Sequence, residues 1–375
     1  MTEFLLQSDI TEIAANLREL APEFAGKHVL LTGGRGFLGR YFTAVFQRFN
    51  ETLLAENPVR VTVLDNLISA GVEGARIPTI PHMRFINHDV RQPFGCFARS
   101  GLWGDAVNAD HVDFILHAAG IASPAHYRKF PLETLEVATR GTQNALELAR
   151  ANPGCRIAFF SSSEIYGDPD AANVPTLETY RGNVACLGPR ACYDMSKRLG
   201  ETLVQIYAEQ YGVHGTIIRP FNVYGPGMQK HDYRVLPNFA ARIAADLPLE
   251  VYGSGNQTRT YCYVTDAIGG FLRVLLHGAA GEPYNVGNPL PEVSVLELAD
   301  RIKFMHQQPG IGTWRDVEVT IMPHPPSYPA DEPNRRCPSI AKIAALGYAP
   351  RVDLDTGLRR FFDWALEAFA VDQAA

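Results

Sequence analysis

The sequence lacks the marks of secreted, metal-binding and membrane-spanning proteins. Its six cysteines lie far apart with no CxxC pair, which indicates reduced thiols rather than a disulfide framework. No HExxH or comparable histidine spacing supports a metal site. No apolar run approaches the roughly 18–20 residues that a membrane span requires. The first residues carry acids early and do not resemble a secretory signal. We therefore expect a cytoplasmic protein that holds no metal.

Positive charge is also sparse. Lysine and arginine total 34 against 40 acidic residues, which leaves a formal net charge of −6 with no basic cluster. This pattern argues against a nucleic-acid surface, although it is compatible with a local basic pocket for a phosphate. Hydrophobic residues make up 46% of the 375, which is sufficient for a substantial core in one large domain or two closely joined ones.

Short apolar segments alternate with helical ones through the first two thirds of the chain. Strands are predicted at residues 27–32, 59–65, 83–89, 112–117, 156–161 and 215–219, with a helix over 37–50 after the first strand. Apolar strands separated by helices are typical of a parallel sheet that is covered on both faces. The expected fold class is therefore α/β, a doubly wound sheet of the Rossmann type with right-handed crossovers.

A glycine-rich turn joins the first predicted strand to the helix. Gly33, Gly36 and Gly39 let the backbone turn tightly and approach a pyrophosphate, which the free amides at a helix N-terminus bind. The spacing GxxGxxG is weak evidence alone, but its place between a strand and a helix strengthens it. Phe37 and Leu38 complete the turn. We predict that this segment binds a dinucleotide.

Residues after the next strands suit the rest of the dinucleotide. Asp65 closes the second strand, where a carboxylate accepts both ribose hydroxyls of NAD and repels the extra phosphate of NADP. Arg35, inside the glycine turn, is a contrary sign, because a cation there can meet that phosphate. Further cofactor contacts are expected from Asn66, Asp89, Val90, Ala118 and Ala119. The predicted cofactor is NAD.

Tyr193 and Lys197 are spaced so that a phenol and an ammonium share one face of a helix. Tyrosine ordinarily has a pKa near ~10, which is too high for a base at neutral pH. A neighbouring ammonium and an oxidised nicotinamide stabilise the phenolate and lower that pKa. We therefore predict that Tyr193 removes a hydroxyl proton with the help of Lys197, and that both contact the cofactor.

A polar turn follows the predicted strand at residues 156–161. Ser162, Ser163 and Glu164 stand where the side chains of such a sheet point into the ligand crevice. A hydroxyl there can share the hydrogen bond to a substrate oxygen, and a carboxylate can handle a second proton. Ser161 is expected to serve as a cap instead.

Three parts of the chain are expected. Residues 1–26 form a leader, 27–220 the NAD-binding Rossmann domain to which later segments return, and 221–375 mainly a smaller α/β lobe for the substrate. The leader has helical periodicity over residues 9–20, with Ser8 or Asp9 as its N-cap. We expect this helix to pack on the main body; a partner-binding role is the alternative.

Together these motifs resemble the extended short-chain dehydrogenases/reductases. The glycine turn, the serine–glutamate turn, the tyrosine–lysine pair and the segments 219–226 (RPFNVYGP) and 259–266 (RTYCYVTD) occur in the order seen in nucleotide-sugar epimerases, dehydratases and decarboxylases. The resemblance covers residues 27–365. It implies a nucleotide-diphosphate sugar as substrate. It also implies a homodimer built from two helices per subunit, here residues 132–152 and the helix that carries Tyr193.

Within that family the chain is most similar to the UDP-glucuronate decarboxylases, the UDP-xylose synthase type. The segments 162–169, 188–194, 251–259 and 285–289 carry this resemblance. The catalytic residues that it implies are Ser162 as the hydroxyl, Glu164 near the sugar ring, Tyr193 as the base and Lys197 as its partner. The substrate contacts expected with it are Asn222 and Arg259 on the diphosphate, Arg336 on the sugar carboxylate or phosphate, and Ser163 and Arg234.

Two places depart from this family's pattern. Met195 and Ser196 stand where those decarboxylases usually carry Glu-Gly, and Ala138 stands where many relatives have asparagine. These differences bear on the substrate rather than on the chemistry.

The residues favour one reaction among those that begin with a 4-keto intermediate. A 4,6-dehydratase needs an acid to expel the C6 hydroxyl, and relatives of that type carry Asp-Glu where this chain has Ser163 and Glu164. A 4-epimerase needs no second carboxylate. A substrate with a C6 carboxylate becomes a β-keto acid, which loses carbon dioxide readily. The preferred prediction is therefore decarboxylation of UDP-glucuronate to UDP-xylose. A 4-epimerase, then a 4,6-dehydratase, are the alternatives, and a dinucleotide-binding sensor without activity is the remote one.

Overall fold

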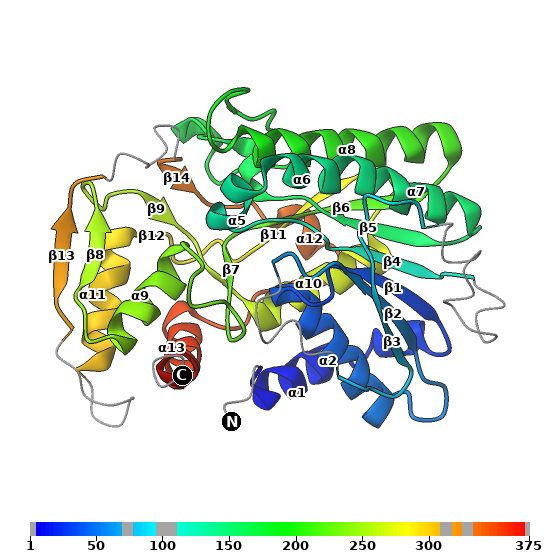
Figure 1. Ribbon diagram of the computed structural model, residues 1–375, viewed down its shortest axis with the longest axis horizontal. Coiled ribbons are helices and arrows are strands. Elements are labelled where there is room, and N and C mark those ends of the chain that lie inside the picture. Colours follow the sequence, from blue (N-terminus) through cyan, green and yellow to red (C-terminus); the bar gives the residue numbers. More distant parts are fainter. Residues whose placement is uncertain (1–4, 70–77, 95–110, 308–316, 325–332, 372–375) are drawn as a thin grey trace.

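The computed structural model describes residues 5–69, 78–94, 111–307, 317–324 and 333–371. Its centre is a seven-stranded sheet in which all strands are parallel (Figure 1). The strands in spatial order are β3 (Met83–Asn87), β2 (Arg60–Asp65), β1 (His28–Thr32), β4 (Phe114–His117), β5 (Arg156–Phe160), β6 (His214–Pro220) and β11 (Pro283–Val286). The six predicted strands are confirmed to within two residues at each end. Strand β11 has no counterpart among them.

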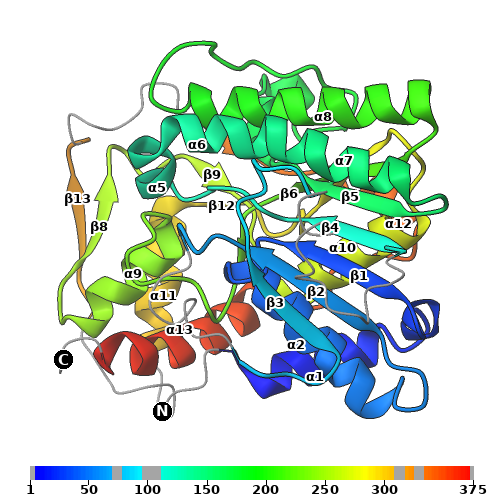
Figure 2. The same cartoon turned by 45° about the vertical axis from the view of Figure 1, so that its right-hand side comes forward.

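Alternate residues of each strand are buried against opposite faces of the sheet. Val29 and Leu31 of β1 share a core with the helices of one face, whereas Leu30 belongs to the core of the other face. Helices α1 (Gln7–Asn16), α2 (Phe37–Thr52) and α10 (Val264–His277) cover the first face, and α7 (Thr142–Ala151) and α8 (Ala191–Tyr211) cover the second (Figures 1 and 2). This arrangement confirms the expected α/β fold.

The helix predicted over residues 132–152 is interrupted by a wider turn. It consists of α6 (Pro131–Glu136), a π-helical turn (Val137–Gly141) and α7, and the short α5 (Pro124–Lys129) precedes it. Helix α8 approaches the π-helical turn closely, because a Cβ atom on Gly200 would lie 2.9 Å from the carbonyl oxygen of Ala138. Glycine at this point of α8 therefore permits the two helices to pack.

The leader packs on the sheet-covering helices, as expected, but its cap differs from the prediction. Helix α1 begins at Gln7 after Leu6, which makes no side-chain cap, so neither Ser8 nor Asp9 is the N-cap. Asp9 points inward because it is fully buried and accepts a hydrogen bond of 2.7 Å from the Tyr263 hydroxyl. A short 3-10 helix, Ala21–Phe24, follows.

Short sheets and three helices form most of the remaining structure, at the end of the molecule away from β3 (Figure 1). The sheets are β8 (Leu249–Tyr252) with β13 (Val319–Met322), β7 (Val223–Tyr224) with β10 (Cys262–Tyr263), and β9 (Thr258–Arg259) between β12 (Val293–Ser294) and β14 (Arg335–Arg336). The helices are α9 (Val235–Ala244), α11 (Val295–His306) and α13 (Leu354–Val371); the short α12 (Ala341–Ala344) lies against β11 of the central sheet instead. A capping box of Ser294 and Glu297 fixes where α11 begins. No helix within the described ranges has the length and apolar character that crossing a membrane requires.

Candidate functional site

The glycine turn after β1 is built to bring a backbone close to a ligand. Gly33 has φ +70°, and a Cβ on it would lie 2.7 Å from the Ala119 backbone. A Cβ on Gly39 would lie 2.5 Å from Gly34, so only glycine fits there. Gly36 is different, because the nearest atom to its Cβ position is 3.4 Å away. The N-terminal end of α2 is therefore less crowded at Gly36 than at the other two glycines, which is compatible with a pyrophosphate there.

Asp65 is fixed at the carboxyl end of β2 by two backbone amides. Its Oδ2 accepts a hydrogen bond of 2.8 Å from the Arg35 amide, and its Oδ1 accepts one of 2.7 Å from the Leu67 amide. The Arg35 guanidinium lies 5.5 Å from the centre of the Phe85 ring, and Arg35, Asp65, Leu67 and Phe85 line one small pocket. Asn66 uses its Oδ1 to accept from the Ile68 amide at 3.2 Å. The carboxylate of Asp65 is thus oriented before any ligand arrives.

Asp89 lies in a chain of charges that reaches helix α6. Its carboxylate accepts from the Arg91 guanidinium at 2.7 Å, and Arg91 pairs with Glu136 at 2.9 Å. Burial alone would raise the pKa of Asp89, but the hydrogen bonds and charge of Arg91 lower it. The carbonyl of Val90 accepts from Asn144 at 2.9 Å. Any ligand at Asp89 therefore shares this carboxylate with Arg91.

The end of β4 places small residues and a neutral histidine beside the glycine turn. Thr32 Oγ1 lies 2.8 Å from His117 Nδ1 and accepts from the Ala119 amide at 3.1 Å. Burial, aided by the charge of Lys197, lowers the pKa of His117 to about 3. His117 Nε2 is buried and has no hydrogen-bond partner among the described residues. Ala118 and Ala119 thus lie against Gly33 of the glycine turn.

Tyr193 and Lys197 share one face of α8, as their spacing predicts. Lys197 Nζ donates to the Phe160 carbonyl at 2.7 Å and lies 5.7 Å from the centre of the Tyr193 ring. That ring stacks on Tyr127 of α5 at 5.4 Å. Burial raises the pKa of Tyr193 to about 12, against a hydrogen bond from Ser162, and lowers the pKa of Lys197 to about 8. The phenol of Tyr193 is therefore protonated at neutral pH, and it would lose the proton only when more positive charge is placed beside it.

The serine–glutamate turn after β5 is a 3-10 helix, Ser163–Tyr166. Its cap is Ser162, whose Oγ accepts from the Glu164 amide at 3.2 Å. The expectation that Ser161 serves as the cap is wrong, because its hydroxyl donates to Glu201 at 2.5 Å instead. Ser163 is buried. The turn thus holds Ser162 next to Tyr193 while Glu164 points to a set of arginines.

Glu164 lies at the centre of a buried ionic group, the Glu164 cluster, which consists of Glu164, Arg190, Asp194 and Arg336. Arg336 forms a two-pronged ion pair with Glu164, at 2.5 and 2.7 Å, and Arg190 pairs with it as well. Burial would raise the pKa of Glu164, but Arg336, Arg190 and Arg259 lower it to about 2. The sequence analysis missed Arg190, although its position four residues before Asp194 on one helix face was a usable signal.

Three predicted substrate residues are held by their surroundings. Asn222 has φ +42° and donates from Nδ2 to the Thr260 carbonyl at 2.8 Å. Arg259 donates to the Pro333 carbonyl at 2.7 Å, and its charge acts on Glu164. Arg234 pairs with Asp232, and its charge lowers the pKa of Tyr193. The charges of Arg259 and Arg234 therefore act on two other residues of the site, Glu164 and Tyr193.

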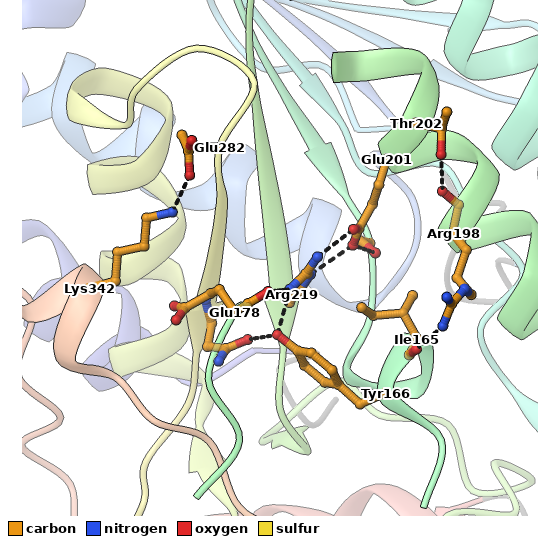
Figure 3. Close-up of polar contacts among 11 residues, drawn as sticks. Ile165, Tyr166, Glu178, Arg198, Glu201, Thr202, Arg219, Glu282 and Lys342 are labelled. Carbon is orange, nitrogen blue, oxygen red and sulfur yellow. Dashed lines mark hydrogen bonds and ion pairs between the residues drawn. The ribbon is translucent and has the colours of Figure 1, made fainter. Parts of the chain in front are cut away.

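A second buried group, the Glu201 network, consists of Glu201, Arg219, Tyr166 and Asn285 (Figure 3). Arg219 donates to Glu201 at 2.6 Å and to the Tyr166 hydroxyl at 2.6 Å, and that hydroxyl donates to Asn285 at 2.7 Å. The network joins α8, β6, the serine–glutamate turn and β11. Sequence reasoning missed it, since its members are far apart in the chain.

Known proteins resemble this chain over most of its length. The model of the NAD dependent epimerase/dehydratase family matches residues 29–287. UDP-glucuronic acid decarboxylase 1 of Xenopus tropicalis is 37% identical over 337 residues, which cover 89% of this chain and 71% of that protein. UDP-glucuronic acid decarboxylase 6 of Arabidopsis thaliana is 37% identical over 333 residues, 88% of this chain and 86% of that protein. UDP-glucose 4-epimerase of Thermus thermophilus, solved with NAD, matches with a TM-score of 0.71 and 26% identity over 90% of this chain and 98% of that one.

The fold and the site define an α/β enzyme that works with a bound dinucleotide. The expected family is confirmed, because its model covers more than half of the residues. The chain belongs to the NAD dependent epimerase/dehydratase family, and NAD is its cofactor.

Proposed function

We propose that this protein decarboxylates UDP-glucuronate to UDP-xylose through a 4-keto intermediate. The observation that carries the proposal is the convergence of Arg190 and Arg336 on one carboxylate, Glu164. A planar guanidinium binds a carboxylate strongly and in a fixed orientation. Such a site suits a sugar that carries a C6 carboxylate. The names of the two relatives, both UDP-glucuronic acid decarboxylases, support the same substrate.

Tyr193 is the proposed base for the C4 hydroxyl. Ser162 donates a hydrogen bond that lowers the pKa of Tyr193, and the Lys197 ammonium is close to the same ring. When bound, NAD would accept the hydride of C4, so that the C4 hydroxyl becomes a ketone, and would give the hydride back to C4 at the end. Ser162 also shares the hydrogen bond to the C4 oxygen, so the proton moves between fixed partners.

Decarboxylation then requires positioning and electrostatics more than further covalent catalysis. The bond from C5 to the carboxyl carbon breaks, and its electron pair is delocalised into the C4 ketone. We assign the sugar carboxylate to Arg336 and the region of the sugar ring to Glu164. The other proposed substrate contacts are Ser163, Asn222, Arg234 and Arg259.

We assign NAD to the glycine turn and to the ends of the neighbouring strands. The less crowded position at Gly36 and the oriented carboxylate of Asp65 support this assignment. The buried and unpaired Nε2 of His117 lies in the same region. The proposed contacts are Gly33, Gly36, Phe37, Leu38, Gly39, Asp65, Asn66, Asp89, Val90, Ala118, Ala119, Tyr193 and Lys197.

We further propose a cytoplasmic homodimer built from residues 132–152, which begin in α6, and from α8 of each subunit. Both helices expose large apolar side chains, namely Leu132 and Leu135 on α6 and Leu199 and Ile206 on α8. Exposed apolar side chains on both helices favour a self-complementary interface. Light scattering is expected to give twice the mass of the chain, and Leu199→Glu should halve it.

The proposed division of the chain keeps residues 27–220 as the NAD-binding domain and 221–375 as mainly the substrate lobe. Strand β11 joins the central sheet and α10 covers it, which supports the return of later segments to the first domain.

The experiment is incubation with UDP-glucuronate and NAD, followed by the mass of the product. Loss of carbon dioxide is the expected result. A product of unchanged mass would identify a 4-epimerase, and loss of water a 4,6-dehydratase. The absence of turnover with any nucleotide sugar would contradict the whole proposal.

A further inference from the structure

The reaction proposed above, on which this inference rests, leaves the sugar one proton short. When carbon dioxide departs, the electron pair of the broken bond passes into the C4 ketone as an enolate. A proton must then form the new C–H bond at C5 while the enolate returns to a ketone. The proton that Tyr193 takes from the C4 hydroxyl does not serve, because it goes back to the C4 oxygen. The protein therefore needs a second proton at the site.

Glu164 is the carboxyl group that the turn motif offers, yet it is held without a proton. Arg336 pairs with both of its oxygens, at 2.5 and 2.7 Å, and Arg190 forms a further ion pair. These arginines outweigh burial and lower the pKa of Glu164 to about 2. A proton reaches C5 from Glu164 only if another group supplies it and if an arginine first moves away.

Asp194, the residue after Tyr193, is the neighbouring carboxyl group, and Arg190 pairs with both Asp194 and Glu164. Asp194 is 6% exposed, and its Oδ2 lies 3.6 Å from Arg190 Nε. Its Oδ1 is buried, and no hydrogen-bond partner for it is found in the part of the chain that the structure describes. Burial and the negative charge of Glu164 raise the pKa of Asp194 to about 7, against Arg190 and Arg336. The groups that face it are Arg190 and Tyr193 on α8, Glu164 in the 3-10 turn, Arg336 on β14 and Tyr127 on α5.

We propose that Asp194 stores the proton that replaces carbon dioxide at C5, and that Glu164 delivers it. The carboxylate of the substrate forms an ion pair with Arg336, and the ion pair between Arg336 and Glu164 breaks. Having lost this ion pair, Glu164 binds a proton more strongly, and the proton passes from Asp194 to Glu164. It then bonds to C5 with the electron pair of the enolate. Water returns a proton to Asp194, so one proton is consumed for each carbon dioxide and no oxidant or reductant is needed.

The test compares the products of the wild-type protein and of Asp194→Asn, both given UDP-glucuronate and NAD. Without the stored proton, carbon dioxide still leaves, but the enolate is protonated only slowly, by water. More of the sugar is therefore released as the nucleotide-linked 4-ketopentose. We expect its ratio to UDP-xylose to rise at least about tenfold in Asp194→Asn. Asp194→Glu restores a carboxyl group and should return the ratio toward the wild-type value. Asp363→Asn on α13, another carboxyl group whose pKa burial raises, is the matched control and should leave the ratio unchanged.

The pH profile of the wild-type protein gives a second readout that does not depend on the folding of a variant. The ratio of 4-ketopentose to UDP-xylose should rise as pH passes through about 7, because Asp194 then loses its stored proton. In Asp194→Asn it should be high at every pH. A wild-type ratio that is flat between about pH 6 and pH 9 overturns the proposal. So does an Asp194→Asn variant that forms less UDP-xylose at an unchanged ratio. A wild-type protein that releases no carbon dioxide from UDP-glucuronate overturns the proposed function instead.

Discussion

The Glu164 cluster and the Glu201 network are both buried, both ionic and both tied to α8, but only one of them is satisfied. In the Glu201 network, both oxygens of Glu201 and all three guanidinium nitrogens of Arg219 have hydrogen-bond partners. In the Glu164 cluster, Asp194 Oδ1 and Arg336 Nε are buried without a partner among the described residues. A buried polar atom left unpaired costs about 1–3 kcal/mol. From this comparison we predict that the satisfied group serves the fold and that the unsatisfied one serves a ligand.

The largest effect is expected beside the Glu164 cluster, for Tyr193→Phe. Removal of the hydroxyl takes away the proposed base, so kcat with UDP-glucuronate should fall by at least about 1000-fold. The affinity for NAD should stay nearly unchanged, because the ring and its stacking on Tyr127 remain. Tyr211→Phe, at the exposed end of the same helix, is the control and should keep full activity. Full activity in Tyr193→Phe would refute the assignment of the base.

Arg219→Met breaks the satisfied network and should affect folding most. It leaves the Glu201 carboxylate buried without its partner, which lowers the free energy of unfolding by about 3–5 kcal/mol. Urea unfolding measures this loss, and the double variant Arg219→Met/Glu201→Met should recover most of it. Lys342→Met removes an exposed ion pair with Glu282 (Figure 3) and should change stability by less than about 1 kcal/mol. If the free energy of unfolding fell as little in Arg219→Met as in Lys342→Met, the distinction between the Glu201 network and the Glu164 cluster would be contradicted.

Arg336→Met removes the proposed carboxylate ligand from the unsatisfied cluster. The KM for UDP-glucuronate should rise by about 10–100-fold, because one charge-assisted contact is lost. The affinity for UDP-xylose, which has no carboxylate, should change little. Stability should fall less than in Arg219→Met, since Arg190 and Arg259 still neutralise Glu164. Arg335→Met on the same strand is the control, and an equal rise of KM there would argue against a specific role.

The smallest effect is expected at Asp9, a third buried acid whose two oxygens both have partners, Tyr263 and Arg360. Burial, against Tyr263 and Arg360, raises its pKa from 3.8 to about 6. The folded state therefore binds this proton more tightly, and stability is lost as pH rises through 6. Between about pH 4.5 and pH 7.5 this loss should be about 2 kcal/mol, and Asp9→Asn should remove it without changing kcat. An unchanged pH dependence of unfolding in that variant would show that another group titrates.

Local patterns in the sequence predicted the elements that local physics determines. Six strands follow from apolar runs, the turn at Gly33 follows from the spacing of glycines between a strand and a helix, and the face shared by Tyr193 and Lys197 follows from helical spacing. The clusters were not predictable in this way. Glu164 and Arg336 are 172 positions apart, and no periodicity relates them. Their pairing depends on how β14 reaches the turn after β5, which is a property of the folded chain alone.

The inward position of Asp9 shows the same limit on a smaller scale. A polar residue near the start of a helix is typical of an N-cap, and the sequence contains nothing to oppose that interpretation. The hydroxyl of Tyr263, 254 positions away, makes a buried place for Asp9 possible. Tertiary contacts therefore overrode a local preference, as they did for Ser161.

The distinction between the two clusters is tested most directly by a crystal structure of Tyr193→Phe with NAD and UDP-glucuronate bound. The sugar carboxylate should lie on Arg336, with Glu164 released from that arginine and the hydrogen bonds of Arg219 unchanged. A structure in which the pair of Glu164 and Arg336 stays intact, with the carboxylate bound elsewhere, would contradict the account.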